Sequence, residues 1–384
     1  MKKYKIENLC TVRSSKRIFA NQYTNDGIPF YRGKEITLLS LGQKISDLLY
    51  INDKAYDDIK TNGVPKENDI LITAVGTIGS VWLIDHNTPF YFKDGNIIWL
   101  SSINANIVLP KYLKYFLISS TFQRKIEEIS IGSNQKALTI DALKKQEIDV
   151  PALNIQQHIV DILGSIDDSI ENNEKIIEVL EEKMLLEYDH LITSTALAES
   201  EMQEIFDISI GKTPPRKESH WFTEKSEDVK WLSISDMGKA KVFAFDSSEK
   251  ITAEGIEKYN VKIAPENTVL LSFKLTIGKV AITGCEMATN EAIAHFVSDD
   301  ENIVEYLYCY LKRYNFDMLG NTSSIATAVN SKTIKAMKFY YPDKETLADF
   351  HSTTEPLIKK IKHLLITNAK LNKLKQLYLK KFFG

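Results

Sequence analysis

Cysteine is scarce in this chain, and the three that occur, Cys10, Cys285 and Cys309, lie far apart. Without a Cys-x-x-Cys pair, neither a disulfide framework nor a structural zinc site is expected. The seven histidines are scattered and form no His-Glu-x-x-His motif, so we expect no metal site. No run approaches the roughly 20 apolar residues of a membrane helix, and the opening residues lack the apolar stretch of a signal peptide. We therefore expect a cytoplasmic protein without membrane contact.

Catalytic motifs are missing as well. Gly211-Lys212-Thr213 is similar to the end of a phosphate-binding loop, but Phe206 stands where that loop needs its first glycine. Pro214 and Pro215 occupy the start of the helix that should follow. The chain contains no Gly-x-Gly-x-x-Gly after a strand, no Gly-x-Ser-x-Gly elbow and no Asn/Asp-Pro-Pro-aromatic motif of amino-methyltransferases. We expect a non-catalytic protein with no cofactor of its own.

The composition is that of a folded protein without a strong charge. The 384 residues suit two or three domains, and 43% of them are hydrophobic. The net charge is −3 and the isoelectric point is about 6.2. A nucleic-acid binder usually has a basic footprint, so any DNA-binding surface here must be local.

An internal repeat is the most informative feature of the sequence. Residues 68–84 (NDILITAVGTIGSVWLI) align with residues 267–283 (NTVLLSFKLTIGKVAIT) at an offset of 199, with six identical positions. Both segments are typical of a strand, a glycine-bearing loop and a second strand. Further matches follow in the same order, at offsets of 201, 194 and 191. They pair residues 28–36 with 229–237, residues 111–117 with 305–311, and Pro151 with Pro342.

The matches predict a module, a long helix, a second module and a second long helix. The expected bounds are 1–150 for module one, 151–191 for its helix, 201–341 for module two and 342–384 for the last helix. The fold class is mixed α/β, with two repeated domains separated by two long helices. Those helices are expected to form an antiparallel coiled coil, and the whole to be pseudo-twofold symmetric.

Both helical segments carry an apolar stripe with a period near 3.5 residues, which is typical of a coiled-coil seam. Asn173 and Asn368 fall on the two seams, where a buried asparagine can fix the register. Residues 151–191 hold ten acids and two lysines, whereas residues 356–384 hold eight lysines and no acid. A charge run alone usually marks a solvated face. Together with the seams, the opposite charges favour intramolecular pairing of the two helices.

Exposed loops with cations and short polar side chains are the candidates for contact with DNA. Residues 211–222 are equally consistent with an ordinary solvated loop, and the glycine loop around Thr77 is more typical of a structural turn. Tyr31, Trp82, Trp99 and Trp231 lie in strand-like runs and are assigned to the core. The candidates in module one are Arg13, Lys16, Arg17, Arg32, Thr77, Lys93, Asn134 and Lys136. Those in module two are Lys212, Thr213, Arg216, Lys217, Lys274, Lys279 and Ser323.

These motifs resemble the specificity (S) subunit of Type I restriction–modification systems over essentially the whole chain. GKTPPRKESHWF (211–222) and DVKWLSISDMG (228–238) resemble the opening of a target-recognition domain of that family. PALNIQQHIVDILGSIDDSIENNEKIIEVLEEK (151–183) resembles its central helix. The counterpart from Pro342 onward lacks the Gln-Gln of 156–157, and module one lacks the Gly-Lys-Thr-Pro run.

The resemblance implies that two target-recognition domains each read half of a bipartite site in double-stranded DNA. The helices would space the halves and dock two methyltransferase subunits, which bind S-adenosylmethionine and methylate adenine at N6. Where motor-nuclease subunits join, they add ATP- and magnesium-dependent cleavage, so every cofactor lies on a partner. The alternative is a two-headed DNA mimic or protein-interaction scaffold with no role in restriction.

Overall fold

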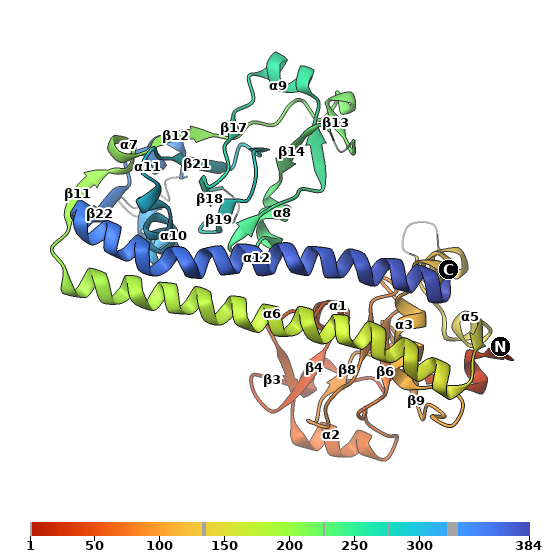
Figure 1. Cartoon of the computed structure of the whole chain (residues 1–384). Helices are drawn as coiled ribbons and strands as arrows, with labels where there is room; N and C mark the ends of the chain where they lie inside the picture. The colour runs from red at the N-terminus through yellow and green to blue at the C-terminus, as the bar shows by residue number, and fades with distance from the viewer. Residues whose placement is uncertain (1, 133–135, 226, 275, 321–328) are drawn as a thin grey trace. The chain divides into compact units, whose positions relative to one another are not determined.

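The computed structural model describes residues 2–132, 136–225, 227–274, 276–320 and 329–384. The chain divides into two compact units. Unit 1 comprises Met1–Glu171 and Ala369–Gly384, and unit 2 comprises Asn172–Asn368. Each unit therefore contains one module and a part of each long helix, α6 (Leu153–Ser194) and α12 (Lys344–Phe383) (Figure 1).

Unit 1 holds an antiparallel sheet in the order β2-β9-β6-β7, a mixed sheet β3-β5-β4-β8 and the pair β1-β10. In the mixed sheet only β4 and β8 run parallel. Its strands are β1 (Lys2–Lys5), β2 (Thr11–Arg13), β3 (Tyr23–Thr24), β4 (Ile28–Tyr31), β5 (Leu49–Ile51), β6 (Ile70–Thr73), β7 (Val81–Leu83), β8 (Tyr91–Phe92), β9 (Ile97–Ser101) and β10 (Glu147–Val150). Its short helices are α1 (Gly33–Ser40), α2 (Asp53–Lys60), α3 (Pro110–Ile118), α4 (Ser120–Ile129) and α5 (Ile140–Lys144).

Unit 2 holds the sheets β12-β21-β18-β19-β15 and β13-β16-β14-β20-β17 and the pair β11-β22. Its strands are β11 (Ala198–Glu201), β12 (Asp207–Ile210), β13 (Phe222–Thr223), β14 (Val229–Leu232), β15 (Phe243–Ala244), β16 (Glu249–Ile251), β17 (Ile263–Ala264), β18 (Val269–Ser272), β19 (Val280–Thr283), β20 (Met287–Thr289), β21 (Ile293–Val297) and β22 (Lys338–Tyr341). Its short helices are α7 (Met202–Ile205), α8 (Ile234–Lys239), α9 (Ala253–Tyr259), α10 (Val304–Arg313) and α11 (Ser331–Lys335).

The two units share one topology, so the predicted repeat is a repeat of fold. The order β2-β9-β6-β7 corresponds to β12-β21-β18-β19, and β3-β5-β4-β8 corresponds to β13-β16-β14-β20. The parallel pair also recurs, since β4 pairs with β8 and β14 with β20. The edge strands β15 and β17 are additions in unit 2.

The repeated Thr-Ile-Gly loops form the same turn in both units. In the β6–β7 hairpin the Thr73 hydroxyl donates to the Thr77 carbonyl and accepts from the Ser80 amide at 2.9 Å. In the β18–β19 hairpin the Ser272 hydroxyl donates to the Thr276 carbonyl at 2.5 Å and accepts from the Lys279 amide at 3.0 Å. The next glycine has a positive φ in both loops, 86° at Gly79 and 85° at Gly278, which favours glycine. The loop around Thr77 is therefore a structural turn.

The tyrosine-rich helices α3 and α10 also occupy equivalent places. The Tyr112 hydroxyl donates to the Asp149 carbonyl at 3.1 Å, and the Tyr306 hydroxyl donates to the Tyr340 carbonyl at 2.7 Å. Each helix thus binds the strand that leads into the following long helix. The largest core of each unit is formed by apolar side chains of α3 or α10, of the sheet that contains β6 or β18, and of the long helices.

The long helices are α6 (Leu153–Ser194), with 42 residues, and α12 (Lys344–Phe383), with 40 residues. They pack against each other in antiparallel fashion, as predicted. In unit 1, Lys375 pairs with Asp167 at 2.6 Å. In unit 2 the Asn173 amide donates to Asn368 Oδ1 at 2.7 Å, which places both predicted seam asparagines at one contact.

The Gln-Gln pair of residues 156–157 occurs in α6 but has no counterpart in α12, and the contacts of Gln156 give a structural reason. Gln156 is fully buried, and its amide accepts from the Leu109 amide at 2.8 Å and donates to the Ile107 and Pro151 carbonyls, both at 2.8 Å. It thereby ties the start of α6 to the start of α3. Leu347 lies at the corresponding place in α12 and packs in the apolar core of unit 2.

Candidate nucleic-acid interface

In unit 2 the loop after β12 is fixed to the ends of β20 and β21. The Gly211 amide donates to the Ile293 carbonyl at 3.0 Å, and the Lys212 amide donates to the Thr289 carbonyl at 2.9 Å. A Cβ at Gly211 would overlap the Thr289 hydroxyl and the Asn290 carbonyl. The glycine of this Gly-Lys-Thr run is therefore required by close backbone packing.

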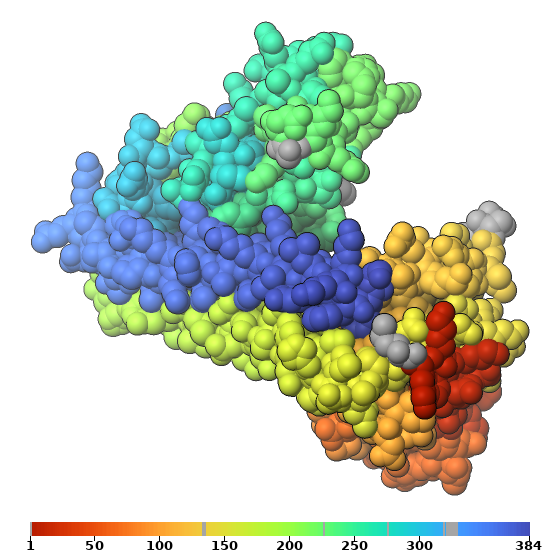
Figure 2. All heavy atoms as spheres, turned by 45° about the vertical axis from the view of Figure 1, so that its right-hand side comes forward, coloured from red at the N-terminus to blue at the C-terminus, as the bar shows by residue number. Residues whose placement is uncertain are grey.

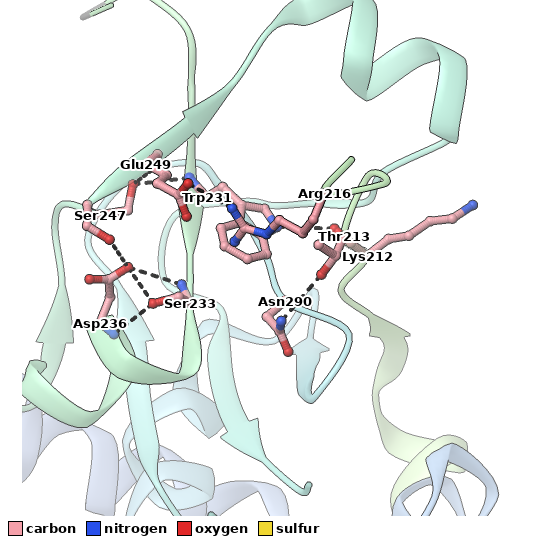
Figure 3. Close-up of polar contacts among 10 residues, drawn as sticks. Lys212, Thr213, Arg216, Trp231, Ser233, Asp236, Ser247, Glu249 and Asn290 are labelled. Atoms are coloured by element: carbon pink, nitrogen blue, oxygen red, sulfur yellow. Dashed lines mark hydrogen bonds and ion pairs between the residues drawn. The ribbon is translucent and has the colours of Figure 1, made fainter. Parts of the chain in front are cut away.

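Trp231 is almost fully buried and contacts this loop. Its indole Nε1 donates to the Lys212 carbonyl at 3.1 Å. The Arg216 guanidinium lies over the Trp231 ring at 4.6 Å and pairs with Glu249 at 2.7 Å (Figure 3). It also lies over the Phe222 ring at 4.0 Å. Arg216 therefore stabilises the loop, although half of its side chain is exposed.

Short polar side chains form a chain of hydrogen bonds on this edge. The Thr213 hydroxyl donates to the Glu291 carboxylate and accepts from the Asn290 amide at 3.3 Å. Asn290 Oδ1 in turn accepts from the Ala292 backbone amide at 2.8 Å, so its orientation is fixed. Glu291 is exposed. Base edges are read by such donors and acceptors when they are held at fixed positions.

A buried histidine lies beneath the loop. His295 has no solvent exposure, and its ring nitrogens lie 3.1 Å from the Ser209 hydroxyl and 2.6 Å from the Thr289 hydroxyl. Burial penalises the charged imidazolium and lowers the pKa of His295 to about 4. The ring is therefore neutral near pH 7 and links β12, β20 and β21.

Asp236 in α8 caps its own helix. Its carboxylate accepts from the Ser233 hydroxyl at 2.7 Å (Figure 3). It also accepts from the Ser248 hydroxyl at 2.9 Å. Burial alone would raise the pKa of Asp236, but these hydrogen bonds outweigh burial and lower it. The carboxylate is therefore ionised and committed to the turn that follows β14.

Unit 1 builds the same edge with different groups. The Ser14 hydroxyl donates to the Ile97 carbonyl at 3.0 Å, and the Ser15 hydroxyl donates to the Phe92 carbonyl at 2.8 Å. These two bonds replace the backbone bonds of Gly211 and Lys212, which explains why module one can lack the Gly-Lys-Thr-Pro run.

Two arginines among the candidates for DNA contact, Arg13 and Arg32, have partners within unit 1. The Arg13 guanidinium stacks on Trp99 at 3.8 Å and donates to the Asn62 carbonyl at 2.9 Å. Arg32 pairs with Glu35 at 2.6 Å at the start of α1. Glu35 is fully buried, which by itself raises its pKa, but the hydrogen bonds from Arg32 dominate and lower the pKa. Arg32 and Glu35 correspond to Ser233 and Asp236 of unit 2.

The remaining candidates divide by their surroundings. Arg17 is exposed and pairs with Asp94 at 2.9 Å in the turn before β9, as Thr213 bonds Glu291 before β21. Asn134 and Ser323 lie outside the described residues. The candidates whose side chains are exposed are Lys16, Thr77, Lys93, Lys136, Lys212, Lys217, Lys274 and Lys279. Lys274 also lies 5.4 Å from the Phe273 ring. Among these, the structure assembles Lys16 and Lys93 near one edge of unit 1, and Lys212 and Lys217 on the corresponding loop of unit 2.

Two functional candidates, Asn290 and Glu291, were missed from the sequence. The signal that could have found them is the repeat, because they follow β20 as Lys93 and Asp94 follow β8. In the described part of the chain, no group of three or more His, Cys, Asp or Glu residues could hold a metal ion. Among these described residues, no helix has an apolar stretch of the length that a bilayer requires.

Comparison with models of protein families shows which family the chain belongs to. The model of the Type I restriction modification DNA specificity domain matches residues 1–182 and again residues 197–376. The chain belongs to this family, and its two matched segments each contain one of the two repeated modules. It is thus a non-catalytic specificity subunit of a Type I restriction–modification enzyme, a family whose members act with DNA and with partner subunits.

Individual relatives agree with this assignment. The chain is 24% identical to the Type I restriction enzyme HindI specificity subunit of Haemophilus influenzae, over 82% of this chain and 85% of that protein. It is 23% identical to the MjaIX specificity subunit of Methanocaldococcus jannaschii, over 88% and 82% of the two chains. Among solved structures, the S subunit of a Type I system from M. genitalium shares the fold, with a TM-score of 0.58 and 18% identity over 100% of this chain and 96% of that one.

Proposed function

We propose that each module of this specificity subunit is a target-recognition domain that reads one half of a bipartite DNA site. Residues 1–150 would form the first domain and residues 201–341 the second. The helices expected at 151–191 and 342–384 would set the gap between the half-sites and dock two methyltransferase subunits. The observation that carries the proposal is the recurrence of one topology, with an equivalent polar edge, in both units.

The reading edge of each domain has two parts. In unit 1 it is the loop after β2 and the turn before β9, and in unit 2 it is the loop after β12 and the turn before β21. In unit 2 this edge presents Lys212, Thr213, Lys217, Asn290 and Glu291. Exposed lysines there can neutralise phosphates, and the fixed amide and carboxylate can select base edges. A glutamate is repelled by phosphates, but it can accept from the amino group of a cytosine in the major groove.

The remaining exposed cations would widen the phosphate-binding surface of each unit. In unit 2, Lys274 and Lys279 lie on the β18–β19 hairpin. In unit 1, Lys136 precedes Ala137, which bridges to Val75 in the loop of the β6–β7 hairpin. Because phosphate contacts release counterions, DNA binding by the subunit should weaken steeply with added salt. The methyltransferase partners would share these contacts, which is compatible with a net charge of only −3.

The direct test is co-expression of the chain with its methyltransferase subunit in a host without adenine methylation, followed by mapping of N6-methyladenine across the genome. The proposal predicts one bipartite motif with two specified halves and a fixed unspecified gap. A continuous motif, or no methylation from an assembled complex, would contradict it. Motor-nuclease subunits, where present, should add ATP-dependent cleavage at the same motif.

A matched pair of variants tests the site. Lys217→Ala should weaken binding to the DNA half-site of unit 2 a few-fold and leave thermal stability unchanged, because Lys217 is exposed. Arg216→Ala should lower stability by about 1 kcal/mol, because it removes the stacking and the Glu249 pair. Equal effects of the two variants on stability would refute the assignment of Arg216 to the loop support.

A further inference from the structure

The last turns of α12 carry an exposed face that is both basic and apolar. In unit 1, Leu374 is 40% exposed and Leu377 is 65% exposed. This lysine–leucine stripe consists of Lys370, Lys373, Leu374, Leu377, Lys380 and Lys381, which are all exposed. Figure 2 shows this end of α12 at the surface. In the described residues no acid forms an ion pair with these four lysines; Lys381 lies 5.9 Å from the Tyr378 ring.

The same position of the repeat is apolar and exposed in unit 2. At the offset of 191 that aligns the two long helices, Leu377 corresponds to Leu186 on α6, which is 57% exposed. One exposed leucine on a surface is ordinary. An exposed leucine at the equivalent place in both copies points to a contact outside the chain.

The charges around the two leucines differ. The α6 counterpart of the stripe consists of Val179, Glu182, Lys183, Leu186, Asp189 and His190. Its two acids are already paired within unit 2, because Arg313 lies 3.5 Å from Glu182 and 2.8 Å from Asp189. The counterpart is therefore nearly neutral and has a 67% exposed Val179, whereas the stripe in unit 1 keeps four positive charges.

We propose that the lysine–leucine stripe docks an acidic amphipathic helix of one methyltransferase subunit, and that the α6 counterpart docks the second copy chiefly through Val179 and Leu186. This inference rests on the proposed function, in which two copies of one partner bind the long helices. A single acidic partner helix complements the stripe by charge but meets a neutral face on α6. The two copies should therefore bind unequally at low salt.

The salt dependence follows from screening. Each exposed ion pair contributes little by itself and is screened within about 10 Å at 0.1 M salt. Four lysines should make the first dissociation constant roughly tenfold lower than the second at 50 mM NaCl. At 500 mM NaCl the two constants should lie within about twofold of each other, because apolar contact with a leucine remains in both.

The test is mass photometry of the 384-residue chain titrated with the methyltransferase subunit of its system at both salt concentrations. The triple variant Lys370→Gln, Lys373→Gln, Lys380→Gln should bring the two constants together already at 50 mM NaCl. Leu377→Ser should abolish the tight step, and the matched Leu186→Ser should abolish only the weaker one. All these side chains are exposed, so melting temperatures should stay within a few degrees of the wild type.

Other outcomes separate the two levels of the proposal. A wild-type chain that binds no methyltransferase subunit overturns the proposed function. Two bound copies with unchanged constants in Leu377→Ser overturn only the docking assignment, as does a tenfold gap that persists in the triple variant. If the triple variant instead loses affinity for a DNA duplex and binds both methyltransferase copies normally, the stripe serves DNA and the inference is wrong.

Discussion

The buried His295 predicts an acid-sensitive unit 2. In the folded state its pKa is about 4, whereas an unfolded histidine has a pKa near 6.5. Between these values the unfolded chain binds a proton that the folded chain does not. The contribution of His295 to the free energy of unfolding is therefore complete above pH 6.5 and is lost as the pH falls toward 4. Lowering the pH from 7.5 to 5.0 should cost about 2 kcal/mol, and the full loss approaches about 3.4 kcal/mol.

The assay is urea unfolding at pH 7.5 and 5.0, followed by pulse proteolysis with mass spectrometry, which reports unit 2 separately from unit 1. Carboxylates also titrate in this range, so the measured quantity is the difference in slope between the wild type and His295→Gln. Glutamine can still bond Ser209 and Thr289 but cannot titrate. The variant should lose less stability than the wild type on acidification, by about 2 kcal/mol. An equal loss in both proteins would refute the argument, and a second variant, His295→Asn, guards against poor packing of glutamine.

Three further substitutions test the packing on which the sites depend. Gly211→Ala should destabilise unit 2 by roughly 2–4 kcal/mol, because its Cβ would overlap Thr289; an unchanged urea midpoint would contradict this. Gln156→Ala should cost about 2–3 kcal/mol in unit 1, because it leaves buried backbone groups unpaired. Proteolysis of unit 1 measures that cost, and a loss below about 0.5 kcal/mol would argue against the clamp. Asn368→Leu should destabilise unit 2 by about 1 kcal/mol, and adding Asn173→Leu should restore the loss. Additive losses in this double-mutant cycle would contradict a direct contact.

Much of the fold could be predicted from the sequence because the repeat and the helical seams are long, periodic signals. The matched offsets identified the paired hairpins, and the 3.5-residue stripe identified the faces that bury Leu163, Met184 and Ile361. The helices were expected to start at Pro151 and Pro342, and each begins two residues later, at Leu153 and Lys344. The domain bounds stay a prediction.

The candidate site could be predicted only in part, because sequence shows which residues are charged but not which neighbours use the charge. Arg13 and Arg32 are committed to Trp99 and Glu35. Those partners are 86 and three residues away along the chain, and composition gave no sign that Glu35 is buried. The loop of residues 211–217 was identified from its prolines and cations. The turn that contacts it, at Asn290 and Glu291, was not identified, because it lies nearly 80 residues later in the chain.

The proposal that two alike heads read a split site is tested most directly by changing the gap between the half-sites. Once methylation mapping gives the motif, duplexes with the native gap, one added base pair or one removed base pair can be titrated with the subunit bound to its methyltransferase. Under that proposal the two helices of 42 and 40 residues, each about 60 Å long, would act as stiff spacers, so either change should weaken binding at least tenfold. Equal affinity for all three duplexes would contradict the account, because the halves would then be read independently of any spacing fixed by the protein.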